Sequence, residues 1–101
     1  MTSITVEELK KRLDSGEKIN LIDVREPAEY QEYNLGGELI PLGQIASMNL
    51  DALESRKNEE LIIHCKMGGR SAQACMILES AGFTNVVNVT GGAMAYKQLV
   101  G

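Results

Sequence analysis

The sequence predicts an α/β protein with a central, mostly parallel sheet of about five strands and helices on both faces. Short apolar segments alternate with amphipathic segments along the whole chain, which is the order of such folds. The apolar segments are rich in β-branched residues and lack polar alternation, which is typical of strands covered on both faces. A chain of 101 residues, 44% of them hydrophobic, can bury one core, so we expect residues 1–101 to form a single domain.

Capping and turn residues bound the elements expected in the first half of the chain. Thr5 and Glu8 fit a capping box, and Ser15-Gly16 suits the end of the helix that this box begins. Pro27 suits the first turn of a second helix. We therefore expect, in order, a short strand at Ile4, a helix over 6–14, a strand over 19–24, a helix over 28–33, a short strand over 38–40 and one or two broken helices over 42–53.

The second half repeats the strand and helix order more clearly. Leu61 to His64 is a short apolar segment typical of a buried strand. Ala74, Cys75 and Leu78 mark one apolar face of a helix that Gly82 closes. The elements expected here are a strand over 61–64, a helix over 71–81, a strand over 86–89, a turn at 91–92 and a helix over 93–100.

Composition excludes several classes of function. The net charge of −4 comes without a basic cluster, which argues against nucleic acid as a partner. No apolar run approaches the length of a membrane span, and the first 20 residues do not resemble a secretory signal, so we expect a cytoplasmic protein with no membrane partner. Two cysteines and one histidine complete no metal-ligand pattern, and we expect no metal and no other cofactor.

The residues that follow the strand over 61–64 are the best candidate for a functional site. Cys65 comes directly after this strand, and Gly68, Gly69 and the start of a helix follow it. In an open α/β sheet, ligands bind beyond the carboxyl ends of the strands, which is where this cysteine falls. A short loop of this kind can direct several backbone N–H groups at its centre, and the helix N-terminus adds a positive field. Both features favour a thiolate or another sulfur anion.

Cationic and hydroxyl side chains accompany the cysteine. Lys66 follows it directly, and four residues separate Cys65 from Arg70. Ser71 can cap the following helix and donate a hydrogen bond to an anion. We therefore predict that Cys65 is a reactive thiol in an anion-binding loop.

The segment Cys65-Lys66-Met67-Gly68-Gly69-Arg70-Ser71 resembles the active-site loop of the rhodanese-homology family, whose sulfurtransferases carry a catalytic cysteine at the first position of a six-residue loop. The resemblance covers almost the whole chain. Residues 23–30 resemble the family's early strand-end signature, and residues 34–38 lie where the family has a turn of the His-Ile-x-Gly-Ala kind. Gly82-Phe83 followed by Val86, and then Gly91-Gly92, resemble the family's C-terminal pattern.

This resemblance implies a rhodanese-like fold and a sulfurtransferase that works through a persulfide on Cys65. The donor would be a small molecule such as thiosulfate, and the acceptor would be cyanide or a cellular thiol. The resemblance implies that the loop amides hold the persulfide. It also implies that Lys66 and Arg70 orient the anionic donor and that Ser71 donates a hydrogen bond to this donor. The six-residue loop also separates the chain from phosphatase relatives, whose loops of the Cys-x5-Arg type are one residue longer.

Residues around the loop carry weaker functional hypotheses. Met67 could favour a less polar acceptor or simply fill the surface. Asp23 could pair with a cation such as Arg70 or form hydrogen bonds at its strand end, and Arg25 could pair with Glu29 or line the pocket. For both, a structural supporting role is favoured over a catalytic one.

Two further side chains have an ordinary structural interpretation and an alternative role in the chemistry. His64 adjoins the nucleophile, but neighbouring residues of a strand point to opposite faces, so a packing or surface role is favoured over a general base. Cys75 lies on the apolar helix face, so a core position is favoured over a resolving cysteine.

Other classes of function remain open at the level of sequence. The protein could carry a persulfide to or from a protein partner, or act as a regulatory binding module. A phosphatase or arsenate reductase would use the same cysteine, although the short loop argues against it. A scaffold without catalysis would require an unreactive Cys65.

Overall fold

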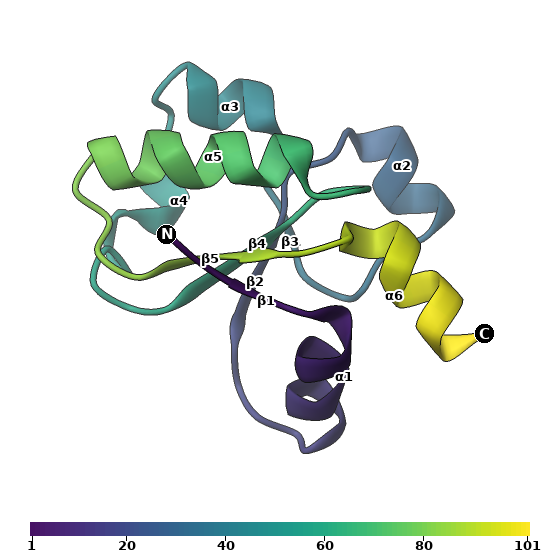
Figure 1. Ribbon diagram of the computed structural model, residues 1–101. Helices are drawn as coiled ribbons and strands as arrows, with labels where there is room; N and C mark the ends of the chain where they lie inside the picture. Colours follow the sequence, from purple (N-terminus) through teal and green to yellow (C-terminus); the bar gives the residue numbers. More distant parts are fainter.

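The computed structural model describes residues 1–101 as five strands and six helices (Figure 1). Their bounds, in chain order, are β1 Thr2–Ile4, α1 Val6–Asp14, β2 Asn20–Asp23, α2 Pro27–Glu32, β3 Glu38–Leu39, α3 Leu42–Ala46, α4 Asp51–Glu54, β4 Leu61–His64, α5 Gly69–Ser80, β5 Val86–Val89 and α6 Gly92–Val100. The expected alternation of strands and helices is confirmed.

All strand pairs in the sheet are parallel, and the strand order is β1-β5-β4-β2-β3. The expected mostly parallel sheet of about five strands is therefore confirmed, and no strand is antiparallel. Strand β4 lies in the middle, with Ile62 opposite Leu21 of β2 and Val87 of β5. Because all strands run in one direction, their carboxyl ends meet at one edge of the sheet, and Cys65 follows the central strand at that edge.

Two hydrophobic layers cover the two faces of the sheet. Ile22 and Ile63 pack with residues of α3, α4 and α5 on one face, whereas Leu21 and Ile62 pack with α1 on the other. Partly buried Ala95 and Tyr96 of α6 complete the second layer. Figure 1 shows α3 and α5 above the sheet and α1 and α6 below it. Residues adjacent in a strand thus pack into different layers, as the nearly unbroken apolar strands predict.

Local signals placed most element ends within one residue. Strand β1 begins at Thr2 and ends at Ile4, where the strand was expected to begin. The capping box of Thr5 and Glu8 is present, with the Glu8 N–H donating to Thr5 Oγ1 at 3.1 Å. Helix α5 begins at Gly69, two residues before the expected start, because Gly68 occupies the cap position with a φ of 113° that favours glycine. The broken helical region divides into α3 and α4, and Met48, with a φ of 63°, lies between them.

Candidate active site

The cysteine-containing loop connects the central strand β4 with the N-terminus of α5. Cys65 follows His64, the last residue of β4, and only residues 66–68 separate it from the helix. Cys65 itself is buried, with 1% of its surface exposed, whereas the side chains of Lys66 and Met67 lie at the surface. Arg70 therefore belongs to the first turn of α5, not to the loop that the sequence predicted.

Backbone and hydroxyl groups surround the sulfur atom. The Gly68 N–H donates to Cys65 Sγ at 3.1 Å, and Ser71 Oγ lies 3.4 Å from the same sulfur. Burial by itself raises the pKa of the Cys65 thiol, but hydrogen bonds from the Ser71 side chain and from the backbone amides of Ser71, Gly68 and Met67 outweigh that effect. The pKa of Cys65 is consequently held below its ordinary value, which favours the thiolate.

Ser71 connects the thiol to a residue on the next strand. Its hydroxyl donates to Gly68 O at 3.1 Å and also contacts Asn88 Oδ1 on β5. The Asn88 amide nitrogen lies 3.4 Å from Gly68 O, which orients the amide oxygen toward Ser71. Asn88 thus holds the loop through Gly68 O and Ser71, although no motif of the sequence predicted a role for it. Its signal was that it is the one polar residue in the otherwise apolar β5.

The N-terminus of α6 holds the outer side of the loop. The Ala93 N–H donates to Cys65 O at 2.8 Å, and the Met94 N–H donates to Lys66 O at 2.9 Å. A Cβ atom on Gly92 would lie 2.4 Å from Cys65 O, so only glycine permits this close approach. With these carbonyls bound to α6, the loop amides are free to face the sulfur.

Arg70 forms a two-pronged ion pair with Glu29 of α2. The two guanidinium nitrogens donate to the two carboxylate oxygens at 2.7 and 2.9 Å. A side-chain hydrogen bond from Arg70 is the main reason that the pKa of Glu29 falls to about 2. No local pattern of the sequence predicted this pair, and the role of Arg70 in orienting a donor stays a prediction.

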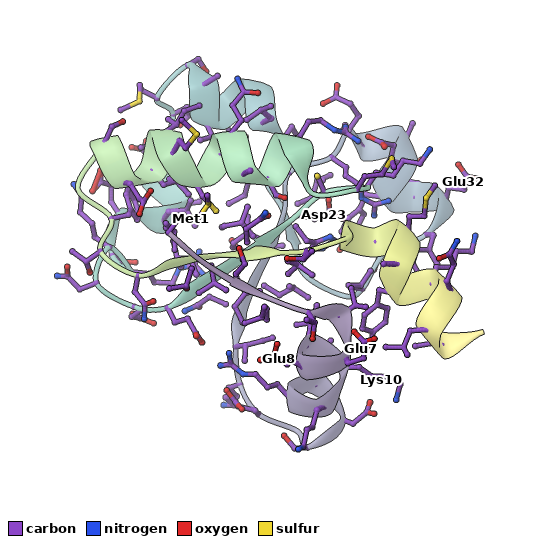
Figure 2. The ribbon with its side chains drawn as sticks, in the orientation of Figure 1. Met1, Glu7, Glu8, Lys10, Asp23 and Glu32 are labelled. Carbon is purple, nitrogen blue, oxygen red and sulfur yellow. The ribbon has the colours of Figure 1, made fainter.

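Asp23 and Arg25 form a buried ion pair beside the loop. Arg25 donates to both carboxylate oxygens, at 3.0 and 2.8 Å, and also to Tyr33 O at 2.6 Å. The partner of Asp23 is therefore Arg25 and not Arg70, and Arg25 does not pair with Glu29. Figure 2 labels Asp23 in the interior of the molecule.

His64 and Cys75 are both buried. His64 Nε2 lies 3.7 Å from Asp23 Oδ2 and has no hydrogen-bond partner. Burial is the main cause that lowers the pKa of His64, so the ring is neutral near pH 7. Cys75 belongs to the larger hydrophobic layer, and burial raises the pKa of its thiol to about 12. The two cysteines therefore differ sharply in acidity.

No group of three or more His, Cys, Asp or Glu side chains in the chain is arranged to hold a metal ion. None of the helices has the length and apolar character needed to span a membrane.

Comparison with known proteins assigns a family to this arrangement. The family model of the rhodanese-like domain matches residues 5–99. The "Sulfurtransferase" of Allochromatium vinosum is 33% identical over 101 residues, which cover 97% of this chain and 90% of that protein. The crystal structure of a rhodanese-like domain protein from Staphylococcus aureus superposes with a TM-score of 0.80 and 39% identity, covering 95% of this chain and 91% of that one.

Other relatives are longer than this chain. The probable adenylyltransferase/sulfurtransferase MoeZ of Mycobacterium tuberculosis is 38% identical over 96% of this chain, and the chain spans 25% of its length. The putative sulfur carrier protein YrkF of Bacillus subtilis is 38% identical over 88% of this chain, and the chain spans 47% of its length.

Proposed function

The chain belongs to the rhodanese-like family of sulfurtransferases, and from this premise we propose that Cys65 carries a sulfane sulfur from a small donor such as thiosulfate to cyanide or a thiol. The observation that supports this role most directly is the surroundings of Cys65 Sγ. The sulfur accepts the Gly68 N–H at 3.1 Å at the N-terminus of α5, a position that stabilises a sulfur anion.

The first half of the proposed reaction loads the cysteine. The Cys65 thiolate attacks the outer sulfur of thiosulfate, a new S–S bond forms, and the bond to the sulfite sulfur breaks. Sulfite leaves with the electron pair, and Cys65 becomes a persulfide with its negative charge on the outer sulfur. Because Cys65 is only 1% exposed, a slim donor suits the loop better than a bulky one. Lys66 forms no ion pair, which supports a role for its ammonium group in attracting an anionic donor to the loop.

The second half unloads the cysteine. Cyanide or a thiolate attacks the outer sulfur, the Sγ–S bond breaks, and the electron pair returns to Cys65 Sγ as a thiolate. The same hydrogen bonds from Gly68 and Ser71 then stabilise the leaving thiolate, so one arrangement serves both halves.

Thiocyanate formation from thiosulfate and cyanide tests the proposal. We expect activity in the wild type and none above background in Cys65→Ala. Cys75→Ala is the matched control and should retain activity, because Cys75 lies in the hydrophobic layer with a pKa of about 12. Equal rates in the wild type and Cys65→Ala would refute the proposal.

A second candidate is a sulfur carrier that exchanges its persulfide with a protein partner. The likeness to the putative sulfur carrier protein YrkF favours this version. It predicts slow turnover with cyanide together with a stable gain of one sulfur atom on Cys65. Mass spectrometry of the intact chain after incubation with thiosulfate distinguishes the two candidates, since rapid loss of the added sulfur to cyanide would favour the enzyme.

A further inference from the structure

A cavity of about 450 Å³ lies between α2 and α6, next to the loop of Cys65. This volume is in the range of sites for small organic molecules and is far larger than thiosulfate needs. Figure 1 shows the two helices on the same side of the molecule, near the loop that leads into α5. The lining of the cavity combines charged side chains from the loop, α2 and α6 with a smaller number of apolar side chains.

The walls of the cavity are the facing sides of two helices. Helix α2 contributes Glu29 and Glu32, with Tyr33 at its end, and helix α6 contributes Met94 and Lys97. Glu29 and Glu32 are three positions apart, as are Met94 and Lys97, which places each pair on one helix face. Tyr33 follows α2 in extended backbone. Tyr33 and Met94 give the cavity an apolar surface, so the site suits the carbon chain of an organic molecule.

The cavity adjoins the reactive loop through shared backbone. Lys66, the residue after the nucleophile, is part of the lining. Ala93 and Met94 also line the cavity, and their N–H groups bind the carbonyls of Cys65 and Lys66 at 2.8 and 2.9 Å. The lining of the cavity therefore includes the residue that directly follows Cys65 in the chain.

The unpaired charges of the cavity favour an anion. Arg25 and Glu29 are neutralised by Asp23 and Arg70. Lys66 and Lys97 form no ion pair, and neither does Glu32, so two ammonium groups face one carboxylate.

The positions of these charged side chains also favour the binding of an anion in the cavity. Lys97 Nζ is held 5.2 Å from the centre of the Tyr33 ring, at the cavity wall. Figure 2 labels Glu32 at the outer side of α2. In a chain of net charge −4, this local excess of positive charge is a distinct feature.

We propose that this cavity is the acceptor site and that it selects small organic thiols carrying a carboxylate, with Lys97 and Lys66 binding the carboxylate and Tyr33 and Met94 contacting the carbon chain. This inference rests on the proposed persulfide chemistry of Cys65. The acceptor thiolate attacks the outer sulfur of the Cys65 persulfide, an S–S bond to the acceptor forms, and the Sγ–S bond breaks. Cys65 Sγ keeps the electron pair of the broken bond as a thiolate, and the acceptor leaves as a persulfide anion.

The first test measures selectivity between matched acceptors. With thiosulfate as donor, kcat/KM is compared for 3-mercaptopropionate, which is anionic, and 3-mercaptopropanol, which is neutral and of similar size. We expect the wild type to prefer the anion, and Lys97→Gln to reduce this ratio by about 2- to 5-fold, the range of a solvent-exposed ion pair. Glu32→Gln should change the ratio in the opposite direction, because it removes the one unpaired carboxylate.

Lys11→Gln is the matched control for this ratio. Lys11 is exposed on α1, forms no ion pair and does not line the cavity, so the substitution changes the net charge equally without touching the proposed site. Equal changes in Lys97→Gln and Lys11→Gln, or no change in either, would overturn the proposed acceptor site. If Lys97→Gln and Glu32→Gln change the selectivity ratio in opposite directions, a general disturbance of the fold is excluded as the cause.

The second test measures binding without sulfur transfer. The thioether 3-(methylthio)propanoate cannot accept sulfur, and we expect it to shift the backbone amide NMR signals of Lys66 and residues 93–97, with weaker binding to Lys97→Gln. Binding by a chain that transfers no sulfur would leave the site intact and refute the proposed function. Sulfur transfer with neither binding here nor selectivity would refute the site and leave the function intact.

Discussion

The single hydroxyl proton of Ser71 has three neighbours that compete for it. Cys65 Sγ lies at 3.4 Å, Gly68 O at 3.1 Å, and Asn88 Oδ1 is in contact. When the proton points at Asn88, Ser71 accepts from the thiol; when it points at sulfur, Ser71 stabilises the thiolate. Asn88 therefore competes with the sulfur anion for the same donor.

This competition predicts opposite effects of two substitutions on the acidity of Cys65. Ser71→Ala removes a donor and should raise the thiol pKa. Asn88→Leu removes one of the two competing acceptors, directs the Ser71 proton to sulfur more of the time, and should lower the pKa of Cys65. The rate of iodoacetamide labelling of Cys65 as a function of pH measures both. If competition for the Ser71 proton is the cause, the double variant should have the same thiol pKa as Ser71→Ala. If Asn88 has a purely structural role, both single variants should instead have a raised thiol pKa.

At the scale of elements, the loop depends on the close contact between the start of α6 and the residues after β4. Gly92 has a φ of 59°, and its Cβ position falls 2.4 Å from Cys65 O and 2.6 Å from Lys66 O. Any side chain here must push the loop away from α6 and weaken the hydrogen bonds from Ala93 and Met94.

We expect Gly92→Ala to lower the free energy of unfolding by about 1–3 kcal/mol and to reduce sulfur transfer, because overpacking displaces the loop backbone. Gly43→Ala in α3 is the matched control. No atom lies within 4 Å of its Cβ position, so it should be neutral or stabilise the chain by about 0.5–1 kcal/mol. Urea unfolding and thiocyanate formation measure the two effects. Wild-type behaviour of Gly92→Ala would contradict the close contact.

At the scale of the whole molecule, two ion pairs lie near the site, and they differ in burial. The side chains of Asp23 and Arg25 are 0% and 6% exposed, whereas those of Glu29 and Arg70 are 30% and 37% exposed. The first pair should therefore matter much more for stability when it is broken than the second.

We expect Asp23→Leu to lower the free energy of unfolding by about 3–5 kcal/mol, since it leaves the Arg25 guanidinium buried without a partner. Asp51→Asn, at an exposed position on α4 without an ion pair, should change it by less than about 0.5 kcal/mol. Urea unfolding at neutral pH compares the variants. Similar values for both would show that the buried pair contributes little.

The exposed pair makes stability depend on acidic pH. The pKa of Glu29 falls from 4.5 to about 2 in the folded chain, so its contribution is complete above about pH 4.5 and is lost as the pH falls toward 2. Because Arg70 is 37% exposed, solvent screening limits this contribution to about 1 kcal/mol or less. The wild type should thus exceed Glu29→Gln in stability at pH 6, and the difference should shrink as the pH falls to 2, as measured by urea unfolding. A constant difference across this range would contradict the assignment.

Local patterns were sufficient for the α/β class, for most element ends and for the candidate nucleophile. These patterns act through neighbouring residues, so they can be interpreted from the sequence alone. Examples are the Thr5 capping box, the apolar strands and the glycines after Cys65. The one shift in a functional element, the earlier start of α5, came from the positive φ of Gly68.

The partners of the charged and polar residues required the folded chain. Glu29 and Arg70 are 41 positions apart, and Ser71 and Asn88 are 17 apart, so no local pattern pairs them. The strand order places β4 between β2 and β5, which brings segments distant in the sequence to one edge of the sheet. Local sequence was thus enough to propose Cys65 as the candidate nucleophile, whereas its hydrogen-bond partners and the neighbouring cavity depend on long-range packing.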